Sequence, residues 1–136
     1  MPYKILNKIL VVAIVLLPAI VDLSCKKQPK CGCNEDVVVT LAKEPGYVIF
    51  DPEYSSARFI PLVNTSAIYY FCNGAEFMDI LEGFVSGETI LLVSGVASWD
   101  CTYLQNASNY QYQQPMYRAY QLTVSAVEED LYGKKK

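Results

Sequence analysis

Most of the chain alternates hydrophobic with polar positions in short segments, which is the pattern of half-buried β-strands. These segments are rich in Val, Ile, Tyr and Phe, the residues that strands favour. They predict strands over 36–51, 58–63, 67–72, 89–99 and 117–127. In the last segment one face carries Tyr120, Leu122, Val124 and Ala126, and the other carries Gln121, Thr123 and Ser125.

Two further features decide how the strands are connected. Hydrophobic residues recur at helical spacing from about Ala75 to Phe84, which predicts a short helix between the third and fourth strands. Pro45–Gly46 divides the first segment and permits either a hairpin turn or a bulge within one long, bent strand. The bulge gives a five-stranded domain, whereas the hairpin gives six strands.

The polar segment 100–116 is the best candidate for a binding surface, because long loops in compact domains often carry function. Tyrosine rings stack on sugars and peptides, and the Asn and Gln residues between them can hydrogen-bond. We therefore expect a site for a glycan or peptide that includes Trp99, Tyr103, Tyr110 and Tyr112. Outward-facing tyrosines elsewhere would extend it, among Tyr47, Tyr54, Tyr69 and Tyr70. The alternative is that the tyrosines fill a small core and the loop is disordered.

The N-terminal apolar run from Ile9 to Val21 follows Lys4 and Lys8 and leads to Cys25. A positive flank, a short apolar run and a small residue before a cysteine indicate a secretory leader. The run is shorter than the roughly 20 residues that a spanning helix needs. An uncleaved anchor and a buried core helix are the alternatives.

The junction Leu23–Lys27 resembles the leaders of bacterial lipoproteins, in particular those of the Bacteroides type. The resemblance implies cleavage after Ser24 and acylation (palmitate-type chains) of Cys25, and several acyl chains give stable anchoring. It also implies an outer-membrane lipoprotein on the periplasmic or surface side, because Lys26 is not the aspartate that retains such proteins in the inner membrane. Asp22 departs from the family pattern, which has an aliphatic residue three places before the cysteine.

Removal of the signal peptide, residues 1–24, leaves a lipidated tether over 25–35, one domain over 36–130 and a charged tail over 131–136. About 100 residues are enough for a single domain with a modest core. Without the leader the basic count falls from 11 to 9 and the acidic count from 14 to 13, so the net charge is about −4. A nucleic-acid binder normally has a basic face, so we expect no nucleic-acid partner.

The sequence contains no histidine, which excludes catalysis through imidazole and histidine-ligated metals. An enzyme would need a carboxylate pair, such as Asp51 with Glu53 or Asp100 with Glu88. Solvated loop acids are the common case, so we expect no catalytic residues and no cofactor.

Four cysteines remain for the mature protein: Cys31, Cys33, Cys72 and Cys101. An even number in an oxidising compartment favours disulfides, with three possible connectivities. A zinc site is the alternative, but Cys31-Gly-Cys33 is too tightly spaced for a zinc knuckle, and we expect no metal.

With residues 36–51 as one bent strand, the element order is β-β-β-α-β-β, and Gly95 bends the fourth strand. This order resembles the OB-fold, a five-stranded Greek-key barrel. The elements Val93–Gly95 and Tyr120–Val124 are similar to those of small OB-like lipoproteins of gut bacteria. A six-stranded β-sandwich is the alternative if Pro45–Gly46 is a true hairpin.

The OB-fold resemblance also implies a disulfide pairing, because its fourth strand runs antiparallel beside the first. The start of the first strand then lies near the end of the fourth, so Cys101 should pair with Cys33, or alternatively with Cys31. Cys72 would be a buried free thiol at the opposite pole, unless the tether reaches it.

These observations together predict an exported, lipid-anchored envelope protein that binds a glycan or peptide and catalyses no reaction. Its expected partners are the membrane, through the lipid anchor, and a glycan, peptide or envelope protein. The alternative is an accessory subunit that packs on an envelope complex through exposed strand edges.

Overall fold

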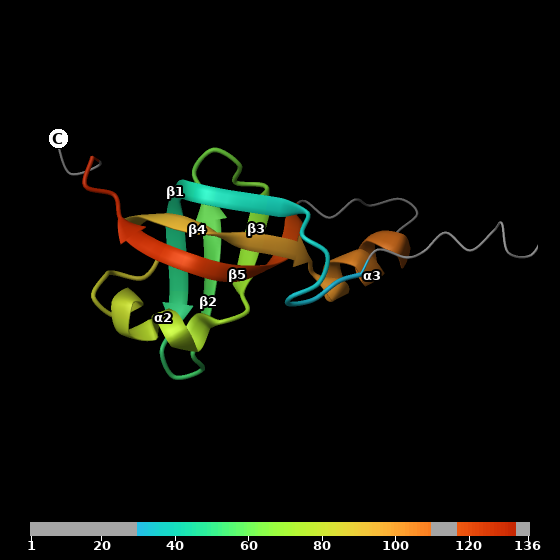
Figure 1. The fold of residues 1–136 in the computed structure, drawn as a ribbon, viewed down its shortest axis with the longest axis horizontal. Coiled ribbons are helices and arrows are strands. Elements are labelled where there is room, and N and C mark those ends of the chain that lie inside the picture. Colours follow the sequence, from blue (N-terminus) through green and yellow to red (C-terminus); the bar gives the residue numbers. More distant parts are fainter. Residues whose placement is uncertain (1–29, 110–116, 133–136) are drawn as a thin grey trace, which may run out of the picture.

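A computed structural model describes residues 30–109 and 117–132 of the chain (Figure 1). The signal peptide, the acylated Cys25, and Tyr110 and Tyr112 lie outside the described residues. The elements are β1 Val39–Asp51, β2 Ser56–Pro61, β3 Ala67–Phe71, α2 Gly74–Leu81, β4 Ile90–Trp99, α3 Cys101–Asn109 and β5 Arg118–Glu129. No helix in the described part is long and apolar enough to cross a membrane.

The five strands form a closed barrel in the order β1-β2-β3-β5-β4. β3 and β5 pair in parallel and the other neighbours pair antiparallel. The helix α2 connects β3 to β4, as the helical spacing predicted. The predicted mainly β, five-stranded OB-like barrel is therefore confirmed, and the six-stranded sandwich is wrong.

The strand β1 continues through Pro45–Gly46, which pair with Leu92 and Leu91 of β4. The irregularity lies just before them, where the register shifts between Leu41 and Glu44. At Gly46 the chain passes so close to β2 that a Cβ atom would overlap the carbonyl oxygen of Ile60. The bulge interpretation is therefore correct, and the glycine serves close approach of two strands rather than a turn.

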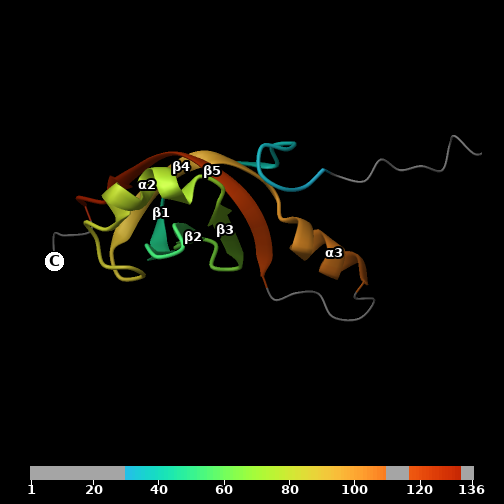
Figure 2. The same ribbon diagram turned by 90° about the horizontal axis from the view of Figure 1, so that it is seen from below.

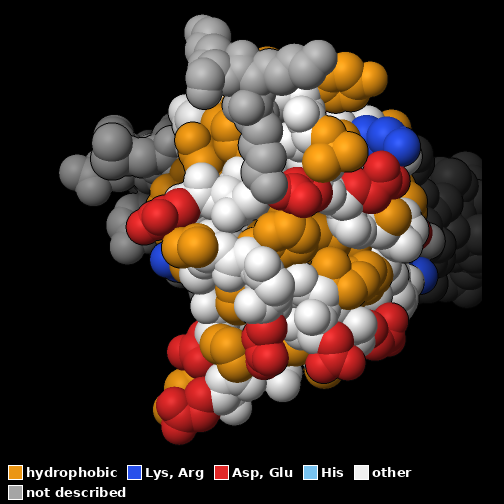
Figure 3. Space-filling model, turned by 90° about the vertical axis from the view of Figure 1, so that its left-hand side faces the viewer, with side chains coloured by type: hydrophobic (Ala, Val, Ile, Leu, Met, Phe, Trp, Pro, Cys, Tyr) orange, Lys and Arg blue, Asp and Glu red, His pale blue; other side chains and the backbone are white. Residues whose placement is uncertain are grey.

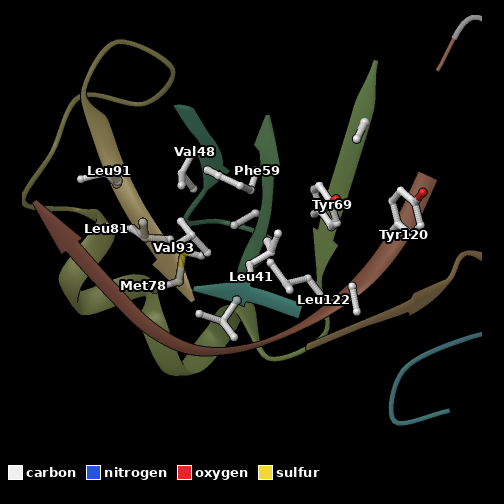
Figure 4. Close-up of a cluster of buried hydrophobic side chains, with 14 residues drawn as sticks. Leu41, Val48, Phe59, Tyr69, Met78, Leu81, Leu91, Val93, Tyr120 and Leu122 are labelled. Carbon is white, nitrogen blue, oxygen red and sulfur yellow. The ribbon is translucent and has the colours of Figure 1, made fainter. Parts of the chain in front are cut away.

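The core fills the barrel with the inward residues of all five strands (Figure 4). Its fully buried large side chains are Phe59, Leu81, Leu91, Leu122, Val48 and Val93. From α2, Met78 and Leu81 point into the same cluster, so the predicted amphipathic helix closes one side of the core (Figure 4). In β5 the residues expected to face inward do so as far as Val124. A register shift then brings Val127, rather than Ala126, against the core.

The segment 31–34 lies against the barrel instead of forming part of a free tether. Cys31 forms a β-bridge with Trp99, and the Gly32 N–H donates to the Trp99 carbonyl at 2.8 Å. Positive φ angles at Gly32 and Asn34 then turn the chain before β1 begins. The part of the expected tether that is described is therefore fixed to the end of β4.

Two disulfides fix this segment, and their pairing corrects the expected one. Cys31 pairs with Cys101 and Cys33 pairs with Cys72. Cys31, which we gave as the alternative partner of Cys101, is therefore its actual partner. The predicted pairing of Cys33 with Cys101 and the predicted free thiol at Cys72 are wrong.

The register of β3 against β5 explains the difference. The last residue of β3, Phe71, pairs with Leu122 near the middle of β5. Cys72 therefore lies halfway along the barrel rather than at the opposite pole. The turn at Gly32 carries Cys33 away from Cys101 and toward Cys72.

Candidate functional site

The segment 101–109, which we expected to be part of a loop, is the helix α3. Asp100 precedes it and caps it, because its Oδ1 accepts a hydrogen bond from the Tyr103 backbone N–H at 2.8 Å. The first residue of the helix, Cys101, is joined to the barrel by the disulfide with Cys31. The helix stands off the barrel beside the end where the described chain begins (Figure 2).

A row of stacked aromatic rings runs from α3 into the core. Tyr103 stacks on Trp99 with ring centroids 5.6 Å apart, and Trp99 stacks on Tyr120 at 4.9 Å. Tyr120 in turn stacks on Tyr69 at 4.9 Å. Trp99, which we predicted to bind ligand, is thus half-buried and stacks between the rings of Tyr103 and Tyr120.

Tyr69 lies in the core with its hydroxyl partly removed from water. Burial raises the pKa of this hydroxyl, and the nearby Tyr120 and Glu44 raise it further. Because a high pKa keeps the hydroxyl neutral, Tyr69 serves the core and not proton transfer near neutral pH.

A groove of about 870 Å³ lies between α3 and the outer faces of β3 and β5. The parallel pairing sets Ile68 beside Ala119 and Tyr70 beside Gln121, and these four side chains form its floor. The other described residues that line the groove lie on α3 or just before α3, β3 and β5: Thr65, Asp100, Thr102, Tyr103, Asn106 and Tyr117.

The groove combines a fixed polar pair with available polar groups. The Gln121 amide donates to the Asp100 carboxylate, so the acid that caps α3 also links the helix to β5. By contrast, within residues 30–109 and 117–132 no hydrogen bond engages the exposed side chains of Thr102 and Asn106. A ligand in the groove would therefore meet aromatic rings beside hydroxyl and amide groups that can bond to it.

Of the four predicted ligand-binding residues, Tyr103 lies in the groove, Trp99 lies behind it, and Tyr110 and Tyr112 are outside the described residues. Tyr70, one of the tyrosines considered as an extension of the site, also lines the groove. The sequence reasoning missed the contribution of β5, and in particular Tyr117 and Gln121. The parallel pairing of β3 with β5 places Tyr117 and Gln121 at the groove. Local sequence patterns do not predict this pairing.

The carboxylate pairs considered for catalysis are not assembled. Asp51 accepts a hydrogen bond from the Glu53 backbone N–H within the turn after β1. Asp100 and Glu88 flank the ten-residue strand β4 at opposite ends. Among the described residues no group of three or more acidic or cysteine side chains is placed to hold a metal ion.

No known family model matches the chain, and the curated proteins include none with significant similarity to it. We therefore argue function from the side chains of the groove itself.

Proposed function

We propose that this protein is an exported, lipid-anchored envelope protein that binds glycans in the groove beside α3 and catalyses no reaction. The observation that carries the proposal is the lining of the groove. Tyr70, Tyr103 and Tyr117 lie in it together with amide and hydroxyl side chains.

These groups suit the chemistry of a sugar. A pyranose ring has apolar C–H faces that pack on aromatic rings, and a rim of hydroxyls that need hydrogen-bond partners. Tyr103 and Tyr117 supply rings, while Thr102 and Asn106 supply polar atoms at the same surface. The volume falls within the range of about 300–1,000 Å³ that is usual for small-ligand sites.

The pairing at the groove favours a glycan over a peptide. Peptides often bind by adding a strand to a free sheet edge. At the groove β3 and β5 pair with each other, so the described sheet offers no free edge there to which such a peptide could add.

Export is supported by two independent features. The N-terminal pattern is typical of a lipoprotein leader, and the cysteines that remain after Cys25 form two disulfides. Disulfides of this kind persist in oxidising compartments such as the bacterial periplasm.

An accessory role in an envelope complex is the second candidate. Figure 3 views the end of the molecule opposite α3, where hydrophobic side chains lie among acidic ones. The exposed hydrophobic residues on α2, on the connection to β4 and after β5 are Ile80, Val85, Leu131 and Tyr132. Such a surface can contact a larger protein.

Calorimetric titration of the lipidated protein in detergent micelles with soluble envelope oligosaccharides tests the proposal. We expect saturable binding that Tyr117→Ala weakens at least tenfold, since Tyr117 lines the groove and is 45% exposed. The matched control is Tyr54→Ala, because Tyr54 is 73% exposed and lies outside the groove lining. No saturable binding, or equal weakening by both variants, would contradict the proposal; co-purification with a larger complex would then favour the accessory role.

A further inference from the structure

The disulfide that joins the N-terminal segment to the barrel lies next to the groove, at the start of α3. The Cα atoms of Cys31 and Cys101 are 5.0 Å apart, and Cys101 begins α3. The second disulfide, Cys33–Cys72, and the hydrogen bond from Ser98 Oγ to the Gly32 carbonyl fix the segment further. The segment therefore cannot swing away from the groove end of β4 while both disulfides are intact.

Cys31 follows the proposed acylation site, Cys25, by only six positions, with five residues between them. Six residues span at most about 20 Å in any conformation. With the short step across the disulfide, the start of α3 lies within roughly 25 Å of the lipid-modified cysteine. The groove is thus confined to the layer of water next to the membrane surface.

The distribution of charge favours the same orientation. Lys26, Lys27 and Lys30 precede the disulfide-bonded segment, and anionic headgroups attract basic residues next to a membrane anchor. Asp79 of α2 and Glu82 and Glu88, which lie between α2 and β4, are acidic, whereas Glu128 of β5 is paired with Lys43 and the chain ends in three lysines. The lysines beside the anchor therefore favour an orientation in which the groove end lies toward the bilayer.

We propose that the ligand of the groove is the saccharide headgroup of a glycolipid embedded in the same membrane, rather than a free oligosaccharide. The inference rests on the proposed glycan-binding function and on acylation of Cys25. Confinement of both partners to one surface raises their effective concentration, so a shallow groove with weak intrinsic affinity is sufficient. The short tether is then part of the recognition, because it holds the groove at the height of the headgroups.

Photocrosslinking in vesicles tests this inference with the full lipidated protein. Benzoylphenylalanine is placed at Gln105, which is exposed on α3 next to the groove, or at Val85, which is exposed at the opposite end. The vesicles contain phosphatidylethanolamine with or without rough lipopolysaccharide as the glycolipid probe. A third variant carries an insertion of about 20 Gly and Ser residues before Lys30, which lengthens the tether several-fold.

We expect the probe at Gln105 to crosslink lipopolysaccharide at least tenfold more than the probe at Val85, and the insertion to reduce this crosslinking several-fold. Equal crosslinking at the two positions would overturn the membrane-facing orientation. Equal labelling of phosphatidylethanolamine without lipopolysaccharide would overturn saccharide recognition at the membrane.

The calorimetric titration separates the two proposals. If soluble oligosaccharides bind the groove but the insertion leaves crosslinking unchanged, the glycan-binding function stands and the membrane-confined ligand is wrong. If no saccharide binds in either format, the proposed function itself fails.

Discussion

Removal of either disulfide should destabilise the barrel by a similar amount, within about 0.5 kcal/mol, although the two close loops of different length. Cys31–Cys101 spans 70 residues and Cys33–Cys72 spans 39. The shorter loop is nested within the longer one. The variants that test this are Cys31→Ser with Cys101→Ser, and Cys33→Ser with Cys72→Ser.

The nested arrangement sets the magnitude. When Cys33–Cys72 remains, Cys31–Cys101 closes a loop of only about 31 residues, because the unfolded chain is shortened by the first bridge. When Cys31–Cys101 remains, Cys33–Cys72 divides a closed ring into two arms, which is equivalent to a loop of about 17 residues. The chain-entropy relation gives about 3.7 kcal/mol for Cys31–Cys101 and about 3.2 kcal/mol for Cys33–Cys72. Removal of both bridges should cost about 8 kcal/mol, which is comparable with the 5–15 kcal/mol that stabilises a typical domain. We therefore expect both double variants to fold and the quadruple variant to be largely unfolded.

Urea unfolding followed by the fluorescence of Trp99, the only tryptophan, measures these differences. The wild type and both double variants are compared in the same detergent, so that the lipid anchor contributes equally. A difference between the two variants of more than about 1.5 kcal/mol would refute the chain-entropy account of the two bridges. A quadruple variant with nearly wild-type stability would refute the view that the disulfides hold the segment 31–34 in place.

Four further predictions follow from particular contacts. Gly46→Ala should destabilise the barrel by about 1–3 kcal/mol, because the new Cβ would overlap the Ile60 carbonyl and the Phe59 ring. The control is Gly83→Ala, whose Cβ would meet only the Ile80 carbonyl at 3.3 Å. Equal melting temperatures of the two variants would contradict the close approach of β1 to β2. Asp100→Ala should cost about 1 kcal/mol and speed amide exchange in α3, since it removes the cap; unchanged exchange would show that the disulfide alone orders the helix. Stability should fall as the pH rises above about 10, because the unfolded protein then loses the Tyr69 proton while the raised pKa keeps this proton on the folded protein. In urea unfolding at increasing pH, Tyr69→Phe should make the midpoint decline less steeply than in the wild type. An unchanged slope would contradict the role of Tyr69. The intact mass of membrane-extracted protein should begin at Cys25 with acyl chains, and four cysteines should react with alkylating agent only after reduction; a mass that begins at Met1 would contradict the leader.

The barrel was predictable from the sequence because its signals are local. Alternation and runs of apolar, β-branched and aromatic residues located all five strands, and the spacing of Phe77, Met78 and Leu81 located α2. Pro45–Gly46 left two interpretations open, since the same dipeptide suits a turn and a bulge. The pairing of β1 with both β2 and β4 resolves them.

The groove was predictable only in part, because it depends on a capped polar helix and on a non-local pairing. The helix α3 lacks a hydrophobic face strong enough to distinguish it from a loop, and its one clear signal is Asp100 at the N-cap position. Tyr103 was found from composition, but Tyr117 and Gln121 join it only through the parallel pairing of β3 with β5. The predicted disulfide pairing was wrong for a related reason. The parallel register of β3 with β5, which places Cys72 within reach of Cys33, is not encoded in cysteine spacing.

The most direct test of the central claim is a two-dimensional amide correlation spectrum of the isotope-labelled protein, recorded while an envelope oligosaccharide is added. Binding in the groove predicts shifts that saturate and that cluster at Thr102, Asn106, Tyr117 and the facing residues of β3 and β5. Saturating shifts confined to α2 and the end of β5, or no shifts at millimolar sugar, would contradict it.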